Sequence, residues 1–223
     1  MSFHDILLDA LADADLVQEC APEKLELKRE IFQQIGAYSP DSAILASSSS
    51  AIVSSEFATA TPARSRVLIA HPGNPPYLLP VIEIVPSQYT DQSTVDRAME
   101  FYRGSGLKPV LVRQELEGFV FNRLQGALLR EAYCLVRDGV ISVEDLDAVV
   151  KNGPGRRWAF MGPFETSDLN TRGGIESHAQ KMGPAYERMG AERGQHDPWV
   201  PELVRIVSDQ RRHSLPIEQW DER

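Results

Sequence analysis

Short apolar runs alternate with longer amphipathic segments through the first half of the chain. The apolar runs predict strands over residues 15–20, 43–46, 66–70, 81–85 and 109–112. The segments between them predict helices over residues 3–11, 22–35, 54–59 and 94–104. Strands and helices that alternate at this spacing are typical of βαβ units. The first half therefore predicts an α/β domain with a parallel sheet.

The second half has a helical apolar pattern throughout. Helices are predicted over residues 118–137, from residue 142, over 182–189 and over 201–210. The longest carries an apolar face that consists of Phe119, Leu124, Ala127, Leu128, Ala132 and Leu135. Such a face covers the core of its own chain more often than a partner, so we expect it to be buried. We place the boundary near Arg113, between an α/β domain over 1–113 and an all-α domain over 114–223.

Composition narrows the class of protein. The chain has 223 residues and a formal net charge of −9, which argues against a nucleic-acid or anionic-membrane surface. Aspartates interrupt the segment 1–15, so neither a signal peptide nor a membrane span is expected there. The two cysteines, Cys20 and Cys134, lie in ordinary apolar contexts, which favours a reducing compartment such as the cytoplasm. No metal site is predicted.

A histidine and a glutamate stand on either side of a turn rich in proline. His71 ends the run 66–70, and Glu83 interrupts the apolar run 81–85. A charge inside such a run costs several kcal/mol unless a partner stabilises it, about 3–5 kcal/mol in measured cases. If His71 is that partner, the carboxylate orients one ring nitrogen and leaves the other free as a general acid or base. The alternative is a turn histidine and an outward-facing glutamate. The rigid turn around Asn74 favours the first interpretation.

Two further polar segments carry weaker signals. Ser47–Ser50 follow a predicted strand, at the edge where open α/β sheets bind ligands, although serines there often only satisfy a turn. Asn122 lies near the start of the long helix, where an asparagine is more often a solvated or capping residue. Neither segment alone predicts a function.

Together these segments resemble one family. The strings ILASSSS, HPGNPP, VIEIVPS and EGFVFNRL contain Ser50, His71, Asn74, Glu83 and Asn122. In these contexts the chain resembles the 3-hydroxyacyl-CoA dehydrogenase family. The strings AHPGNPPYLLPVIEIVP and NGPGRRWAFMGPFETSDLN resemble its λ-crystallin and L-gulonate 3-dehydrogenase branch. The resemblance extends from about Ala12 to Asp209.

The resemblance implies a reaction and the residues that carry it. In this family hydride passes between NAD and a 3-hydroxy acid or its thioester. By position, His71 is the general acid/base and Glu83 orients it. Ser50 and Asn122 would bind the reacting oxygen or the nearby cofactor. In the resembled family the helical domain also supplies a dimer contact, which implies a homodimer.

The resemblance also assigns the cofactor site. Glu23 and Lys28, in the string PEKLELK, match positions that contact the dinucleotide, as do Ser50 and Asn74. The reacting partner would be a small 3-hydroxy or 3-oxo acid.

Arg157 is a candidate for substrate binding. It lies in a predicted turn rich in glycine and proline, where a basic residue is commonly only solvated. A guanidinium matches a carboxylate with two parallel hydrogen bonds, so we expect Arg157 to bind the carboxylate of a small acid. This would favour a sugar acid over an acyl-CoA.

One feature of the family is missing from the sequence. The family begins with a strand, a G-x-G-x-x-G turn and a helix, and the nearest string, at 104–106, follows a helix and lacks the third glycine. By resemblance the chain starts near the fourth strand of the nucleotide domain, which implies an incomplete Rossmann-type parallel sheet domain over 1–113 followed by the α-helical C-terminal domain. It is then a fragment of an ordinary dehydrogenase or a natural short form. A short form could carry out acid–base or hydrolytic chemistry on a 3-oxo acid without a cofactor. A non-catalytic binding or structural protein is the third alternative.

Overall fold

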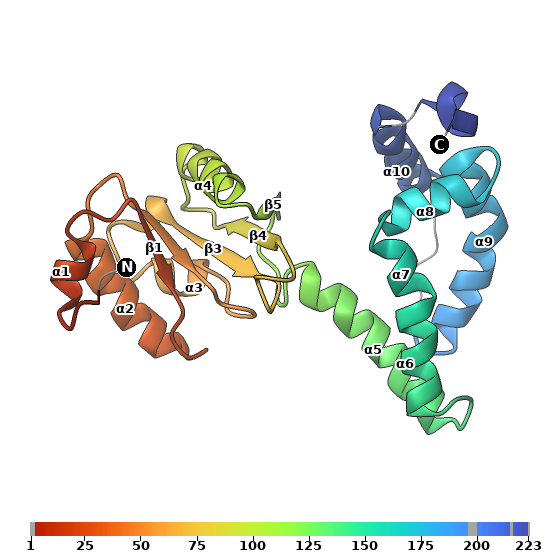
Figure 1. Cartoon of the computed structure of the whole chain (residues 1–223), viewed down its shortest axis with the longest axis horizontal. Coiled ribbons are helices and arrows are strands. Elements are labelled where there is room, and N and C mark those ends of the chain that lie inside the picture. Colours follow the sequence, from red (N-terminus) through yellow and green to blue (C-terminus); the bar gives the residue numbers. More distant parts are fainter. Residues whose placement is uncertain (1–2, 196–199, 215, 223) are drawn as a thin grey trace. The chain divides into compact units, whose positions relative to one another are not determined.

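The computed structural model describes residues 3–195, 200–214 and 216–222. The chain divides into two compact units, Met1–Glu131 and Ala132–Arg223 (Figure 1). The first unit is an α/β sheet domain, and the second is helical in the part that the structure describes. The predicted boundary near Arg113 stays a prediction.

The first unit contains a five-stranded sheet whose order in space is β1-β2-β3-β4-β5. The strands are β1 (Leu16–Glu19), β2 (Ile44–Ser47), β3 (Val67–Pro72), β4 (Val81–Pro86) and β5 (Lys108–Leu111). The pairs β1–β2, β2–β3 and β4–β5 are parallel, so the sheet is mostly parallel as predicted. The pair β3–β4 is antiparallel, which the expected parallel sheet did not include. Residues 73–80 contain no crossover helix, and parallel neighbours need a connection of about a dozen residues or more.

Helices cover both faces of this sheet. They are α1 (Leu7–Leu11), α2 (Leu25–Tyr38), α3 (Ser55–Ala58), the short 3-10 helix η1 (Arg64–Arg66) and α4 (Gln92–Gly104). Phe32 of α2 and Phe57 of α3 pack in one apolar cluster, and Val95 of α4 packs in the other. The helices predicted over 3–11 and 22–35 begin later than expected, since α1 begins at Leu7 and α2 begins at Leu25. Lys24, the residue before α2, has extended backbone angles.

Side-chain alternation along β3 and β4 determines where the polar pair lies. Val67 and Ile69 of β3, and Val85 of β4, belong to the cluster on the α2 and α3 face. Successive side chains of a strand point to opposite faces, so the face that holds Ile69 also holds His71, and the face that holds Val85 also holds Glu83. The strands therefore carry both polar side chains on one face of the sheet.

The second unit contains α6 (Val143–Asn152), α7 (Pro154–Trp158), α8 (Pro163–Asn170), α9 (Gly174–Ala191), α10 (Pro201–Ser214) and the 3-10 helix η2 (Ile217–Glu222). The predicted cap of α6 is confirmed, because the Ser142 hydroxyl accepts a hydrogen bond from the Asp145 N–H at 3.1 Å. The predicted helix over 182–189 is part of the longer α9, which continues through Pro184. Residues 154–158, expected as a turn, form α7 with a proline in its first turn.

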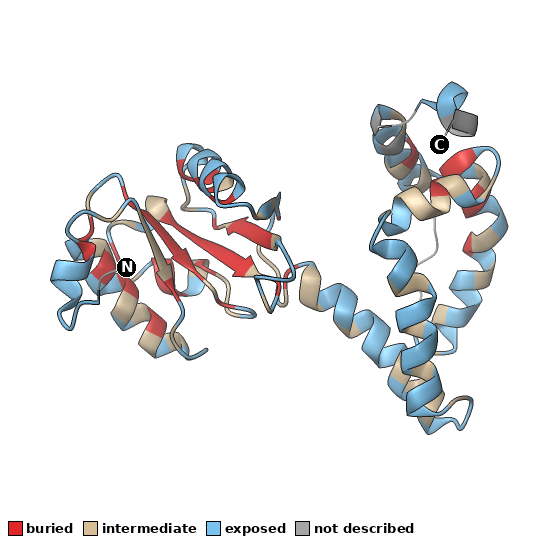
Figure 2. Cartoon of the chain, in the orientation of Figure 1, coloured by how far each residue is buried: buried red, intermediate tan, exposed pale blue. Residues whose placement is uncertain are grey.

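The long helix α5 (Phe121–Arg137) begins in the first unit and ends in the second. Its apolar face was expected to be buried, and this expectation is wrong for the residues within α5, although Phe119 just before the helix is fully buried. Leu124 is 63% exposed and Leu128 is 40% exposed, and no residue of α5 is buried (Figure 2). Helical periodicity shows that an apolar face exists, but it does not show what covers it. Within the described ranges, no helix is both long and apolar enough to cross a membrane.

Candidate functional site

The site begins with a hydrogen bond between neighbouring strands. His71 of β3 and Glu83 of β4 are direct partners in the antiparallel register. His71 Nδ1 lies 2.8 Å from Glu83 Oε2, and both side chains are buried. The contact predicted between these two side chains is confirmed, and the catalytic role of the pair stays a prediction.

The second oxygen of Glu83 is held by the backbone at the start of α5. The N–H groups of Val120 and Phe121 donate to Glu83 Oε1 at 2.8 and 2.9 Å. Burial by itself raises the pKa of this carboxyl. The hydrogen bonds from His71, Phe121 and Val120 outweigh burial and lower the pKa of Glu83 below its ordinary value. The carboxylate therefore stays charged beside the imidazole.

Two phenylalanines enclose the imidazole. The ring of Phe119 lies 5.6 Å from the His71 ring, and that of Phe121 lies 6.3 Å away, edge to face. Phe119 is fully buried and has φ +47°. No other non-glycine residue in the described part of the chain has a positive φ. A side chain in this region costs about 1–3 kcal/mol, so the surrounding contacts must stabilise it.

Ser50 and Asn122 are joined by a hydrogen bond between the Asn122 side chain and the Ser50 backbone. Asn122 Nδ2 donates to the Ser50 carbonyl oxygen at 3.1 Å. Asn122 follows Phe121, whose ring packs against His71, and is half-buried, while Ser50 is exposed. The helix start thus connects the loop after β2 to the surroundings of the imidazole.

Glu23 organises the loop after β2. Its carboxylate accepts hydrogen bonds from the Ser49 hydroxyl and from the N–H groups of Ala51 and Ile52, the last two at 3.1 and 3.0 Å. Partial burial raises the pKa of Glu23, but these hydrogen bonds and the nearby charge of Lys28 lower it overall. The side chain remains 35% exposed, so one side of it faces solvent.

Lys28 is buried too deeply to contact a ligand directly. Its side chain is 1% exposed, and its ammonium is 2.9 Å from Glu19 Oε2 and 3.7 Å from Glu23 Oε2. It also donates to the Ser47 hydroxyl at 3.4 Å. Lys28 of α2 therefore links Glu19, the last residue of β1, to Ser47, the last residue of β2. Ser47 belongs to the serine run noted in the sequence, but its contact with Lys28 was not predicted, and Glu19 was not predicted as a member of this cluster.

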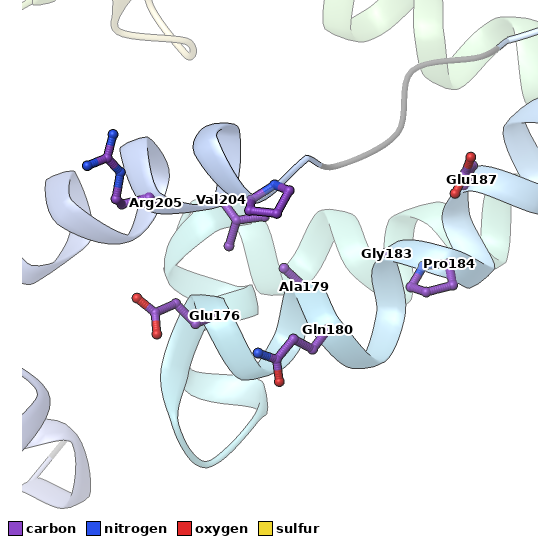
Figure 3. A pocket seen from close by; sticks show the side chains of 9 residues that line it. Glu176, Ala179, Gln180, Gly183, Pro184, Glu187, Val204 and Arg205 are labelled. Carbon is purple, nitrogen blue, oxygen red and sulfur yellow. The ribbon is translucent and has the colours of Figure 1, made fainter.

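Asn74 and Arg157 lie outside these clusters. Asn74 is exposed in the turn after β3 and precedes the cis peptide bond to Pro75. Arg157 is exposed on α7 of the second unit, beside a cavity of about 330 Å³ that Trp158 and Tyr186 also line. A second cavity of that unit, of about 440 Å³, lies between α9 and α10 and is lined by none of the predicted site residues (Figure 3).

The structure thus has a mostly parallel sheet with a buried His–Glu pair at the carboxyl end of β3, followed by a helical region. Residues 2–116 match the family model "3-hydroxyacyl-CoA dehydrogenase, NAD binding domain", and residues 118–212 match the C-terminal domain of the same family. The chain belongs to the 3-hydroxyacyl-CoA dehydrogenase family.

Individual relatives agree with this assignment. The chain is 43% identical to a 3-hydroxyacyl-CoA dehydrogenase of Gibberella moniliformis, over 98% of this chain and 69% of the relative. It is 44% identical to lambda-crystallin of Oryctolagus cuniculus, over 82% of this chain and 57% of the relative. The chain thus spans between 57% and 69% of the length of these two curated relatives.

A solved structure shows the same fold. The crystal structure of 5-formyl-3-hydroxy-2-methylpyridine 4-carboxylic acid 5-dehydrogenase, an NAD+-dependent dismutase, matches with a TM-score of 0.75 at 30% identity. The match covers 96% of this chain and 74% of that one.

The residues at this sheet edge fit one end of a dinucleotide. The carboxyl ends of β1, β2 and β3 meet there, and Glu23, Ser50 and Asn74 present polar groups to solvent. Hydroxyl, amide and carboxylate groups are suited to the ribose and amide of a nicotinamide nucleoside. The 223-residue sequence contains no G-x-G-x-x-G string to receive a pyrophosphate.

Proposed function

We propose that this chain carries the acid–base centre of an NAD-dependent 3-hydroxy-acid dehydrogenase. The observation that carries the proposal is the buried His71–Glu83 hydrogen bond of 2.8 Å, with the second Glu83 oxygen held by two backbone N–H groups. A charged, fixed carboxylate orients the imidazole so that its Nε2 is available to a substrate hydroxyl. Membership in a family of dehydrogenases supports the same reaction.

The proposed roles follow from this arrangement. His71 takes the proton of the 3-hydroxyl group during oxidation and returns it to the 3-oxo oxygen during reduction. Glu83 stabilises the protonated imidazole without moving the proton to itself. Asn122 and Ser50 supply donors near the reacting oxygen. When bound, NAD supplies the hydride acceptor or donor at the 3-carbon.

Four residues are proposed for the cofactor site. Glu23, Ser50 and Asn74 lie where they can contact the nicotinamide nucleoside directly. Lys28 acts behind them, because its buried ammonium lies 3.7 Å from Glu23 and helps to fix that carboxylate. Loss of Lys28 would therefore weaken cofactor binding without removing a direct contact.

The proposed substrate is a small 3-hydroxy acid with a free carboxylate, of the L-gulonate type. Arg157 would bind that carboxylate with two parallel hydrogen bonds. The name of the solved relative also includes a carboxylic acid.

We propose a homodimer that covers the exposed face of α5. Leu124, Leu128 and Leu129 are 63%, 40% and 45% exposed, a large apolar area for a helix in water. Leu124→Glu is expected to yield monomers in analytical ultracentrifugation at micromolar concentration. A wild-type protein that sediments as a monomer contradicts the proposal.

The cysteines Cys20 and Cys134 are free thiols, which favours the cytoplasm as the compartment of this protein.

Two measurements test the dehydrogenase proposal. The first is calorimetric titration with NADH, for which saturable binding is expected. The second is oxidation of 3-hydroxy acids by wild type and by His71→Asn, which keeps a similar shape but removes the base. The variant is expected to lose about 10²–10⁴-fold in kcat.

The cofactor-free alternative makes the opposite prediction. It requires no NADH binding, together with proton exchange or cleavage of a 3-oxo acid that depends on His71. A folded protein without turnover in either assay leaves the binding-protein alternative.

A further inference from the structure

The segment that holds Glu83 has an unusual backbone. Gly118 and Phe119 both have positive φ, +75° and +47°, immediately before α5 begins at Phe121. This reversal turns the next two N–H groups, of Val120 and Phe121, toward one carboxylate oxygen. Successive N–H groups that converge in this way form an anion-binding nest. The start of α5 adds its positive dipole end to the same point.

A phenylalanine at position 119 adopts a backbone conformation that is unfavourable for a bulky side chain. Glycine adopts a positive φ at no steric cost, whereas a bulky side chain is strained there. The Phe119 ring is nonetheless fully buried in the cluster that includes Phe32 and Phe57. It also packs at 5.6 Å from the His71 ring. Glycine would give the same backbone without the ring, so the ring has a use of its own.

We propose that Phe119 is the positioning residue of the His71–Glu83 pair. Its left-handed backbone directs the Val120 and Phe121 N–H groups at Glu83, and its ring holds the imidazole against the same carboxylate. The kinetic consequence rests on the proposed function, while the effect on Glu83 geometry does not. Phe119 has no titratable or nucleophilic group of its own and acts through His71 and Glu83.

Three substitutions separate the backbone from the ring. Phe119→Val introduces a β-branched residue, which strongly disfavours positive φ, so the nest is expected to open. Phe119→Gly keeps the backbone and removes the ring. Phe119→Leu keeps most of the buried volume and replaces the aromatic contact. Phe32→Leu is the matched control, because Phe32 is equally buried in the same cluster and its ring packs against Phe57.

The first readout is structural and needs no enzyme activity. Titration of ¹³C-labelled glutamate followed by NMR reports the Glu83 carboxyl, and amide hydrogen exchange reports Val120 and Phe121. In Phe119→Val we expect the Glu83 midpoint to move to higher pH and both amides to exchange at least about 10-fold faster. Phe119→Gly keeps both values near wild type, and Phe32→Leu leaves both unchanged.

The second readout is kinetic. Phe119→Val is expected to lower kcat on the order of 10²-fold with KM within about twofold. Phe119→Gly and Phe119→Leu are expected to show smaller losses, because the nest remains. The backbone part of the proposal is overturned if Phe119→Val keeps wild-type exchange and titration, or if Phe32→Leu changes them equally. If wild type shows no dehydrogenase activity, the proposed function fails, while the NMR and exchange results still decide the positioning role.

Discussion

The two units of this chain differ in how they hold their apolar side chains. All but two of the apolar residues that are buried in the described chain lie in Met1–Glu131. The exceptions are Ile175 and Ala179, both of α9. The strands β2, β3 and β4 of the first unit are almost continuously buried, whereas most helical surface of the second unit is exposed (Figure 2).

The two units differ in where apolar side chains are buried and where they are exposed. The α/β unit has a core of its own on each face of the sheet, and it carries the His71–Glu83 pair at the end of that core. The helical unit exposes large side chains such as Phe160 and Phe164, 83% and 59% exposed. The first unit thus contains most of the buried apolar core, whereas the helical unit leaves most of its large apolar side chains exposed.

The largest expected effect comes from a truncation in the first core. Phe57 is fully buried, and its ring lies 4.5 Å from that of Phe32. Phe57→Ala is expected to lower the free energy of unfolding by about 3–5 kcal/mol. Phe164→Ala in the second unit is expected to cost less than about 0.5 kcal/mol. Urea denaturation of both variants measures this difference, and equal losses would contradict the contrast between the units.

The second prediction uses an ion pair from each unit. Lys28→Met leaves Glu19 charged and buried, so we expect a loss of about 3 kcal/mol. The double variant Glu19→Gln, Lys28→Met should recover most of it. The control is Arg193→Ala, which breaks a partly exposed 3.0 Å pair with Asp138 and should barely change the unfolding midpoint. If the double variant is no more stable than Lys28→Met, the loss does not come from the unpaired charge.

The third prediction concerns acid. Burial and the nearby Lys181 lower the pKa of His178 in the second unit, and the folded state therefore binds protons less readily than the unfolded state. Stability from this group is complete above the ordinary histidine pKa of about 6.5 and is lost as pH falls below it. Glu83, with its lowered pKa, contributes fully above about pH 4.3 and loses its contribution below that. Hydrogen bonds to such a charged group contribute about 1.5–3 kcal/mol.

The helical unit should therefore weaken at a higher pH than the sheet unit. Methyl NMR signals of Ile175 and Ile69 report the two units separately. His178→Gln should remove the loss that begins below the ordinary histidine pKa of about 6.5, and Glu83→Gln should remove the one at lower pH. Simultaneous loss of both signals in wild type would show that the units unfold together.

The smallest expected effect is on substrate binding. Arg157→Ala should raise KM for a carboxylate substrate at least about 10-fold, because the variant loses both charge-assisted hydrogen bonds to the carboxylate. Arg156→Ala, the neighbouring arginine on α7, is the matched control and should leave KM unchanged. An unchanged KM in Arg157→Ala rules out the carboxylate contact.

Sequence reasoning reached the strands and the His71–Glu83 contact because both depend on local pattern. A charge in an apolar run requires a partner, and the short turn brings the nearest one to it. The partners of the second Glu83 oxygen are backbone groups of Val120 and Phe121, which no side-chain pattern reveals. A glycine before the helix at Gly118 was the available signal. The exposure of Leu124 also escaped prediction, because an amphipathic helix has the same periodicity whether its own chain or another molecule covers it.

The register between β3 and β4 has a consequence for redesign. His71 and Glu83 face each other through strand pairing, with Gly73 N–H bonded to the Val81 carbonyl at the end of the ladder. The loop beyond, with Tyr77 and Leu78 83% and 68% exposed, takes no part in holding the pair. Insertions or grafted sequences there should change which molecules reach the sheet edge while the imidazole keeps its acid. Randomising Tyr77 and Leu78 alone should therefore leave the His71–Glu83 hydrogen bond and Asn74 in place.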